Sequence, residues 1–226
     1  MRRLWIAFAP FIVLSIVHVA ALAAHADALA APTKLTLMPL LAFAVVWGSR
    51  GTPWTTPLTL LVVAIGLSWL GDGAGTFFPF APELPMMLLF FGLAHLVYIW
   101  LFWRRLAVHR VPPWAAVYAV WWVVLLAVLW PHLGNLSIAV AVYGLVLGGT
   151  AFAASRCHPL VAWGGVFFLT SDSVLAFRLF LPDAMPAWTS PLVMLTYCLG
   201  QGLIAAGVLV AIRARRTAAA KTPVAA

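Results

Sequence analysis

Charged residues are scarce in this chain. Only 8% of its 226 residues are Asp, Glu, Lys or Arg, whereas a soluble domain carries roughly 25%. Hydrophobic residues make up 65%. Such a composition leaves no room for a separate soluble domain, so any chemistry must be carried by groups on membrane helices. The sequence therefore indicates an integral membrane protein.

Cysteines and metal-ligand patterns are also sparse. Cys157 and Cys198 do not provide a disulfide framework, and no ligand spacing of the zinc type occurs. The net charge of +8 would suit nucleic acid, but the basic residues lie in short loops and near the C-terminus, where they direct membrane topology. The sequence therefore predicts no metal site and no nucleic-acid partner.

Long apolar runs, separated by short loops, fill most of the chain. At about 1.5 Å per residue, runs of this length match a hydrocarbon core of about 30 Å. They predict an all-α, polytopic membrane helix bundle of eight transmembrane helices in one domain, residues 1–212, with a basic, disordered cytoplasmic tail at 213–226. The expected spans are 4–24, 32–48, 57–78, 84–103, 113–130, 136–154, 159–180 and 188–212.

The first of these spans resembles a signal peptide. It follows Arg2 and Arg3, and Ala24-His25-Ala26 is similar to a cleavage site. Its apolar run is longer than the hydrophobic region of a usual signal peptide. We therefore expect this span to be retained as a membrane helix.

Lys and Arg are divided unevenly between the two sides of the predicted bundle. One side holds only Lys34 and Arg178. The positive-inside rule then places both termini in the cytoplasm, and we expect a bacterial inner membrane. The basic residues of the cytoplasmic side are Arg2, Arg3, Arg50, Arg104, Arg105, Arg110, Arg156, Arg213, Arg215, Arg216 and Lys221.

The two halves of the chain also resemble each other. Asp72 lies in the third span and Asp172 in the seventh, and small residues flank each of them. Four spans per half would preserve orientation, which is the pattern of a parallel repeat about an axis along the membrane normal. A 4+4 repeat and two unrelated halves both stay open at this point.

Asp72 and Asp172 are expected inside apolar spans. A charge at this depth costs a few kcal/mol or more without partners, so an intramembrane acid is a functional hypothesis. Counting along the helices places Asp72 about 9 Å and Asp172 about 12 Å below the outer helix ends. Other polar groups of the outer-to-middle zone are His95, Tyr143, Tyr197 and Gln201, with Lys34 and Arg178 at its mouth.

Two functions suit this set of groups. Two aspartates in one pocket can bind protons or cations in a transporter, or act as acid and base in hydrolysis. The individual residues also have simpler interpretations. Tyr143 suits packing, His95, Gln201 and Ser173 suit hydrogen bonds between helices, and Lys34 and Arg178 suit contacts to lipid phosphate.

Five short motifs occur in order along the chain. They are Lys34 with Met38-Pro39-Leu40-Leu41, Leu70-Gly71-Asp72, Gly92-Leu93-Ala94-His95 with Tyr98, Ser171-Asp172-Ser173, and Tyr197 with Gly200-Gln201-Gly202-Leu203-Ile204. Together they resemble the motifs of the YhhN-like lysoplasmalogenase family of eight-span membrane proteins. Three departures occur: Leu35 stands where proline is expected, Gly200 where alanine is expected, and Gly73-Ala74-Gly75 where an aliphatic stretch is expected. None replaces a polar group.

The resemblance implies hydrolysis of the vinyl ether bond of lysoplasmalogens, with no metal or organic cofactor. The substrate would be a lysophospholipid that enters from the bilayer, and Asp72 and Asp172 would be catalytic. A hydrolase of another lysolipid or ether lipid, or a non-enzymatic proton-coupled transporter, are the alternatives. The head group, the oligomeric state and which aspartate is the acid stay open. The expected substrate-binding residues are Lys34, His95, Tyr98, Tyr143, Ser171, Ser173, Arg178, Tyr197 and Gln201.

Overall fold

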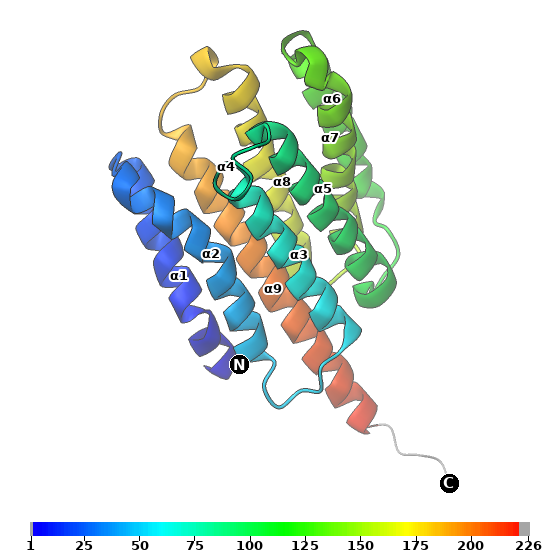
Figure 1. Cartoon of the computed structure of the whole chain (residues 1–226). Helices are drawn as coiled ribbons and strands as arrows, with labels where there is room; N and C mark the ends of the chain where they lie inside the picture. Colours follow the sequence, from blue (N-terminus) through cyan, green and yellow to red (C-terminus); the bar gives the residue numbers. More distant parts are fainter. Residues whose placement is uncertain (1, 222–226) are drawn as a thin grey trace.

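Nine α-helices form the part of the chain that the structure describes. This computed structural model describes the backbone of residues 2–221 and the side chains of residues 5–218, and this part contains no strand. Figure 1 shows the long helices packed side by side as one bundle. The helices are α1 (Arg2–Ala23), α2 (Asp27–Gly48), α3 (Thr56–Asp72), α4 (Ala74–Phe77), α5 (Glu83–Trp100), α6 (Val117–Leu129), α7 (Ser137–Ala154), α8 (Pro159–Phe180) and α9 (Thr189–Lys221).

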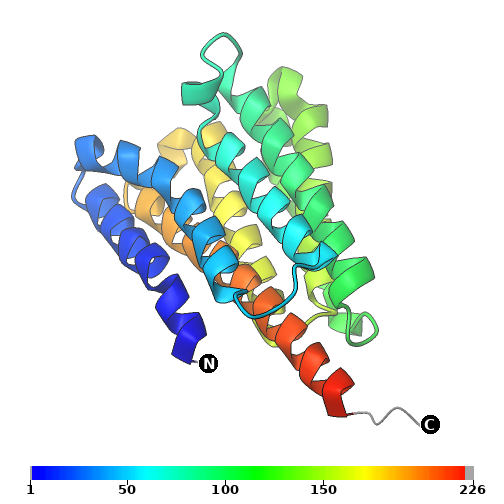
Figure 2. The ribbon, with the colours of Figure 1, turned by 60° about the horizontal axis from the view of Figure 1, so that its bottom comes forward.

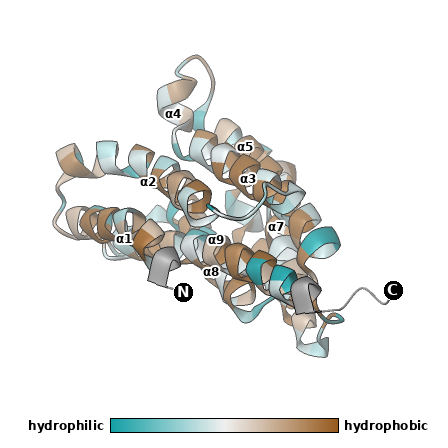
Figure 3. Ribbon diagram, turned by 90° about the horizontal axis from the view of Figure 1, so that it is seen from below, coloured by the Kyte–Doolittle hydropathy of each residue, from teal (hydrophilic) through white to brown (hydrophobic). Residues whose placement is uncertain are grey.

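Most of these helices suit a membrane interior. Within the described residues, seven helices are long and apolar enough to cross a membrane, and α3 is a shorter apolar helix of 17 residues. Large apolar side chains face outward, for example Trp5, Ile138 and Trp163, each at least 60% exposed. Hydrophobic colour runs along the long helices in Figure 3, whereas hydrophilic residues gather near the C-terminus. The predicted all-α polytopic membrane bundle is confirmed.

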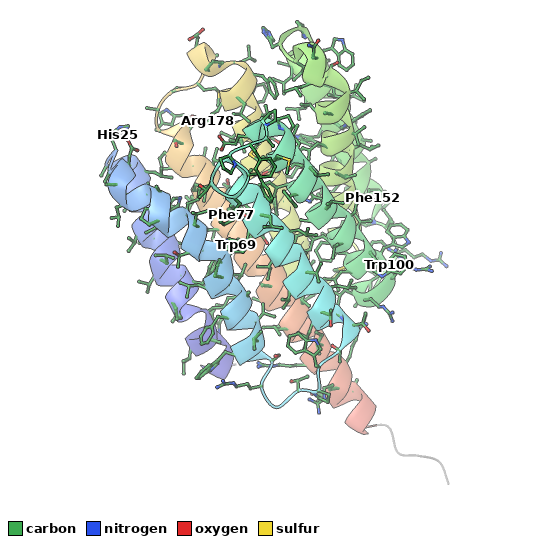
Figure 4. The ribbon with its side chains drawn as sticks, in the orientation of Figure 1. His25, Trp69, Phe77, Trp100, Phe152 and Arg178 are labelled. Carbon is green, nitrogen blue, oxygen red and sulfur yellow. The ribbon has the colours of Figure 1, made fainter. Side chains whose placement is uncertain are left out.

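The two ends of the described chain lie at the same end of the bundle. Figures 1 and 2 both place the start of α1 and the end of α9 there. His25 and Arg178 lie at the opposite end, as Figure 4 shows. This agrees with the topology predicted from Lys and Arg, in which Arg178 is on the side away from the termini. The assignment of the end with the termini to the cytoplasm stays a prediction.

Helix α9 lies at the centre, and its contact with α8 is especially close. It is buried along most of its membrane-spanning part. A Cβ atom on Gly164 of α8 would lie 2.9 Å from the carbonyl oxygen of Gly200 on α9, and one on Gly200 would lie 2.8 Å from the backbone nitrogen of Phe168. Small residues allow two backbones to approach this closely. The pair α8 and α9 is therefore a rigid support for the side chains that it carries.

Helix α1 packs against the same central helix. Phe8 and Phe11 are buried in the main hydrophobic core. The Phe11 ring lies beside Gly202 of α9, where a Cβ atom would come within 3.1 Å of it. The first predicted span is thus a packed element of this bundle, although retention of the span in the mature protein stays a prediction.

Two predicted helix boundaries were wrong. The second span was expected to start at Pro32, but α2 starts at Asp27 and contains Pro32 in its interior. An acid in the first turn, as Asp27 is, favours a helix start. The third span was expected to continue to residue 78, but α3 ends at Asp72 and a separate short helix, α4, follows Gly73.

The prediction of a disordered tail from residue 213 was wrong for residues 213–221. Helix α9 continues to Lys221, and its arginines donate hydrogen bonds to backbone carbonyl oxygens of neighbouring segments: Arg213 to Gly48, Arg215 to Arg105, and Arg216 to Gly51 at 3.1 Å. Alanine, which recurs in this stretch, is also the strongest helix former. Residues 222–226 lie outside the described part of the chain.

Candidate active site

A cavity of about 130 Å³ lies among α2, α3, α5, α7, α8 and α9. Its walls are mainly apolar, with Leu84 and Phe91 from α5 and Phe180 from α8 among them. The polar groups of the wall come from five helices that are distant in sequence, so only the fold brings them together. They are Lys34, Asp72, Tyr143, Ser171, Asp172 and Tyr197, six of the predicted site residues.

Asp72 lies at the C-terminal end of α3, not within a continuous helix as the sequence suggested. The helix stops because Gly73 leaves the helical conformation, and the Phe77 ring of α4 folds back to 4.8 Å from the Trp69 ring. Trp69 and Phe77 can be followed in Figure 4. The Trp69 indole Nε1 donates a 2.9 Å hydrogen bond to the carbonyl oxygen of Leu35, which ties this end of α3 to α2. These contacts fix Asp72 on the cavity wall that Lys34 also lines.

A carboxylate at a helix C-terminus faces the negative end of the helix dipole, so Asp72 needs compensating partners. The hydroxyl group of Tyr197 donates a 2.7 Å hydrogen bond to Asp72 Oδ2. Behind it, Gln201 Nε2 donates to Ser68 Oγ at 3.0 Å, and Gln201 Oε1 accepts from the Tyr98 hydroxyl at 2.6 Å. Tyr98 and Gln201 therefore support the site from behind and do not line the cavity.

Asp172 has a different set of neighbours. The hydroxyl group of Tyr143 donates a short hydrogen bond to Asp172 Oδ2. The His95 ring is fully buried behind this pair, with Nε2 at 3.5 Å from the Tyr143 hydroxyl and 3.9 Å from Asp172 Oδ2. On the other side of the ring, Nδ1 lies 3.1 Å from Thr150 Oγ1. His95 thus contacts the Tyr143–Asp172 pair through Nε2 only.

Lys34 is half-buried and lines the cavity. Over the described residues, its ammonium group makes no hydrogen bond and no ion pair. Its positive charge acts on the nearby Asp72. Without a hydrogen bond of its own, the ammonium group is also suited to bind an anionic group of a ligand, and a lysine binds phosphate as a compact point charge. The position of Lys34 is thus compatible with a contact to phosphate, and that contact stays a prediction.

Besides His95, Tyr98 and Gln201, two further predicted site residues lie outside the cavity wall, Ser173 and Arg178. The Ser173 hydroxyl accepts a hydrogen bond from Trp121 Nε1 at 3.0 Å and donates one to the carbonyl oxygen of Leu169. The Arg178 guanidinium donates to Thr189 Oγ1 at 2.5 Å and stays at the loop between α8 and α9. Ser171 does line the wall, although its hydroxyl donates to the Val193 carbonyl oxygen at 2.9 Å.

Ser68 and Thr150 belong to the hydrogen-bond networks of the site, and the sequence reasoning missed both. Their spacing held a signal: Ser68 lies four residues before Asp72, and Thr150 lies seven after Tyr143. Both spacings put the two members on one helix face. Each of the two aspartates thus has its own set of neighbours behind a shared cavity.

Within the described residues, no group of three or more His, Cys, Asp or Glu side chains is arranged to hold a metal ion.

These features define a class: a polytopic helical membrane protein with two carboxylates on one internal cavity. The chain matches the YhhN family over residues 29–208, and it belongs to that family. The predicted resemblance is confirmed, and the match contains all five motifs, from Lys34 to Ile204, whereas α1 precedes it. Neither a curated protein nor a solved structure matches the chain.

Proposed function

We propose that this protein is an intramembrane hydrolase that cleaves the vinyl ether bond of lysoplasmalogens. The products are a fatty aldehyde and glycerophosphocholine or glycerophosphoethanolamine. The observation that carries the proposal is the pair of aspartates on one apolar cavity, each hydrogen-bonded by its own tyrosine. Membership of the YhhN family supports it.

The chemistry of a vinyl ether suits two carboxyl groups. A proton is delivered to the β carbon, which leaves an oxocarbenium ion on the other carbon. Water adds to that ion, and the resulting hemiacetal collapses to aldehyde and alcohol. The reaction needs a general acid, a carboxylate that stabilises the cation, and a base for water, and glycoside hydrolysis divides the same roles between two carboxyl groups.

The cavity is suited to only part of such a lipid. Its volume of about 130 Å³ is below the roughly 300–1,000 Å³ of pockets that enclose a whole drug-sized ligand. The vinyl ether and glycerol would occupy the cavity, and the hydrocarbon chain would extend between apolar helices into the bilayer. Lys34 would bind the phosphate at the rim, and His95, Tyr98, Tyr143, Ser171, Tyr197 and Gln201 would shape or support the polar wall.

The test measures aldehyde release from lysoplasmalogen by the purified protein in detergent, with product masses recorded for a panel of lysolipids. We expect release by the natural sequence and loss of about 10²-fold or more in Asp72→Asn and Asp172→Asn, the scale of general acid–base catalysis. Asp183→Asn, which changes an exposed acid in the loop before α9, is the matched control. Normal rates in both site variants would refute the catalytic assignment.

The break between α3 and α4 favours one alternative. Interrupted helices beside an ionisable residue are typical of transporters, and Asp72 lies at this break. A proton-coupled transporter would move its substrate across sealed liposomes and leave it intact. Intact substrate inside the liposomes, with no aldehyde formed in detergent, would favour transport over hydrolysis.

A further inference from the structure

Thr150 lies beside one ring nitrogen of the buried His95. Its side chain is 1% exposed, and its hydroxyl oxygen lies 2.9 Å from the Val146 carbonyl oxygen and 3.3 Å from that of His95. Carbonyl oxygens only accept hydrogen bonds, so either of them can take the single hydroxyl proton. With the proton placed there, a lone pair of Thr150 Oγ1 faces His95 Nδ1 at 3.1 Å. This arrangement suits the His95 tautomer that carries its proton on Nδ1.

In this tautomer, Nε2 is the nitrogen that faces Asp172. It lies 3.9 Å from Asp172 Oδ2, and the only proton of the Tyr143 hydroxyl is already directed at Asp172. If both Nε2 and the carboxylate lacked a proton, two acceptors would face each other in a buried setting, which is costly. One proton on either partner removes this conflict, so the geometry suits a proton shared between His95 and Asp172.

Asp72 has a different set of polar neighbours. Tyr197 donates a hydrogen bond to it, and Lys34 lines the same cavity wall. The Gln201 amide behind Tyr197 does not titrate, so this side of the cavity has no counterpart to His95. The two aspartates therefore differ in their proton supply.

We propose that Asp172 is the general acid of the reaction, that His95 returns its proton, and that Thr150 is a positioning residue which holds His95 in the required tautomer. Asp72 is then the carboxylate that stabilises the cation and accepts a proton from water. The assignment rests on the proposed vinyl ether hydrolysis. It uses the two different hydrogen-bond networks described above and adds Thr150 to the site.

The steps balance as follows. The O–H bond of Asp172 breaks, and the π electrons of the vinyl ether form the new C–H bond, which leaves the oxocarbenium ion. Water adds its oxygen to this ion while one of its protons moves to Asp72. In the collapse of the hemiacetal, the glycerol oxygen leaves with the proton of Asp72. The hydroxyl proton of the hemiacetal passes to the Tyr143 hydroxyl on the cavity wall, which gives its own proton to His95 Nε2, and His95 returns a proton to Asp172. Both carboxyl groups and Tyr143 thus end in their starting states.

The tautomer can be tested without any substrate. The imidazole nitrogen signals of the ¹⁵N-labelled full-length protein are compared by NMR, and the His95 signals are identified by their loss in His95→Asn. We expect a protonated Nδ1 in the natural sequence and in Thr150→Ser, which keeps the hydroxyl group. Thr150→Val, which has a similar shape but no hydroxyl, should lose this signature. An unprotonated Nδ1 in the natural sequence would overturn the role of Thr150.

The assignment of the acid is tested by the pH dependence of kcat/KM, which reports the essential acid and base of the free enzyme. The titratable groups around Asp172 and His95 are Lys34, Asp72, Tyr98, Tyr143 and Tyr197, from α2, α3, α5, α7 and α9. Since loss of activity at high pH reports the acid, Tyr143→Phe and Thr150→Val should move the alkaline limb and leave the acidic limb in place. Tyr197→Phe should move the acidic limb only, and Thr150→Ser should move neither.

These measurements distinguish a wrong assignment of the acid from a wrong hydrolase function. If Tyr143→Phe moves the acidic limb and Tyr197→Phe the alkaline one, the roles of the two aspartates are reversed and the present assignment is wrong. If the natural sequence releases no aldehyde, the hydrolase function fails together with the acid assignment. The NMR result then still shows whether Thr150 sets the tautomer of His95.

Discussion

Tyr197 and Asp72 are 125 residues apart in the chain, and a 2.7 Å hydrogen bond joins the tyrosine hydroxyl to the carboxylate Oδ2. The bond connects the central helix α9 to the end of α3 at the wall of the cavity. A hydrogen bond to a charged group contributes about 1.5–3 kcal/mol. This one therefore fixes the position of Asp72 on the cavity wall.

Replacing Tyr197 with Phe removes this bond and keeps the ring. We expect lower hydrolytic activity at every pH below neutrality and a loss of stability of about 1–3 kcal/mol, because Asp72 is left without its donor at the end of α3. Thermal unfolding in detergent and aldehyde release measure the two effects. Unchanged unfolding and unchanged activity would show that Asp72 does not depend on Tyr197.

Gln201 links three polar side chains in a fully buried network. Gln201→Leu should destabilise the fold by about 1–3 kcal/mol for each buried group left without a partner, chiefly Tyr98 and Ser68. Adding Tyr98→Phe removes one of these orphaned hydroxyl groups, so the double variant should unfold at a higher temperature than Gln201→Leu alone. Simple addition of two destabilising effects would show that the two residues are not coupled.

The close contact of α8 and α9 makes two glycines sensitive to a single methyl group. Gly164→Ala and Gly200→Ala would each place a Cβ atom within 3 Å of the backbone of the partner helix, so the helices must separate. We expect a loss of about 1–3 kcal/mol, as for overpacked cores. Gly66→Ala in α3 is the matched control, because nothing lies within 4 Å of its added methyl group.

In an open position such as Gly66, alanine is the better helix former by about 0.5–1 kcal/mol. The control should therefore keep or raise the unfolding temperature, while the two variants at the α8–α9 contact lower it. Equal effects at all three glycines would mean that helix propensity, and not the approach of the two backbones, decides their stability.

The sequence predicted both Lys34 and Arg178 as phosphate ligands, but only Lys34 lines the cavity. Lys34→Gln should raise the KM for lysophospholipids and change kcat little, since the lost contact is made equally in the ground state and the transition state. Arg178→Gln should leave KM almost unchanged, because this guanidinium is bonded to Thr189 outside the cavity. A larger effect on KM from Arg178→Gln would assign the phosphate to the α8–α9 loop.

Cys157, in the loop between α7 and α8, should be unreactive in the folded protein. Burial raises the pKa of its thiol to about 12, although the nearby Arg156 and Arg215 act to lower it. With its pKa above the pH, the thiol stays protonated at pH 8, and only the thiolate is the nucleophile. We expect no maleimide adduct on Cys157 in detergent at pH 8 and full labelling after unfolding. Rapid labelling of the folded protein would show that the loop opens.

The sequence predicted α8 well because its ends are marked: His158 and Pro159 open it, and Pro182 follows its end. It missed the end of α3, since Gly-Asp-Gly inside an apolar run does not by itself show a break. The effect of Gly73 depends on Phe77 and Trp69, which meet only in the folded chain.

The candidate site could also be predicted only in part. Depth along a helix follows from residue counting, so the meeting of Asp72, Asp172, Lys34 and Tyr197 could be predicted. Rotation about the helix axis could not, because it depends on packing against neighbours. Successive residues point about 100° apart, since a turn holds about 3.6 residues. Ser171 therefore lines the cavity while Ser173 contacts Trp121.

Hydrolysis inside a membrane consumes water, and the short helix α3 bears on where that water comes from. Its 17 residues extend about 25 Å, roughly 5 Å less than the hydrocarbon core. The carboxylate of Asp72 therefore lies at the end of a helix that stops short of the far membrane surface, next to the loop that carries α4. In the proposed hydrolysis, water would enter at this shallow end, next to α4, and the reaction would need no pore through the interior of the bundle.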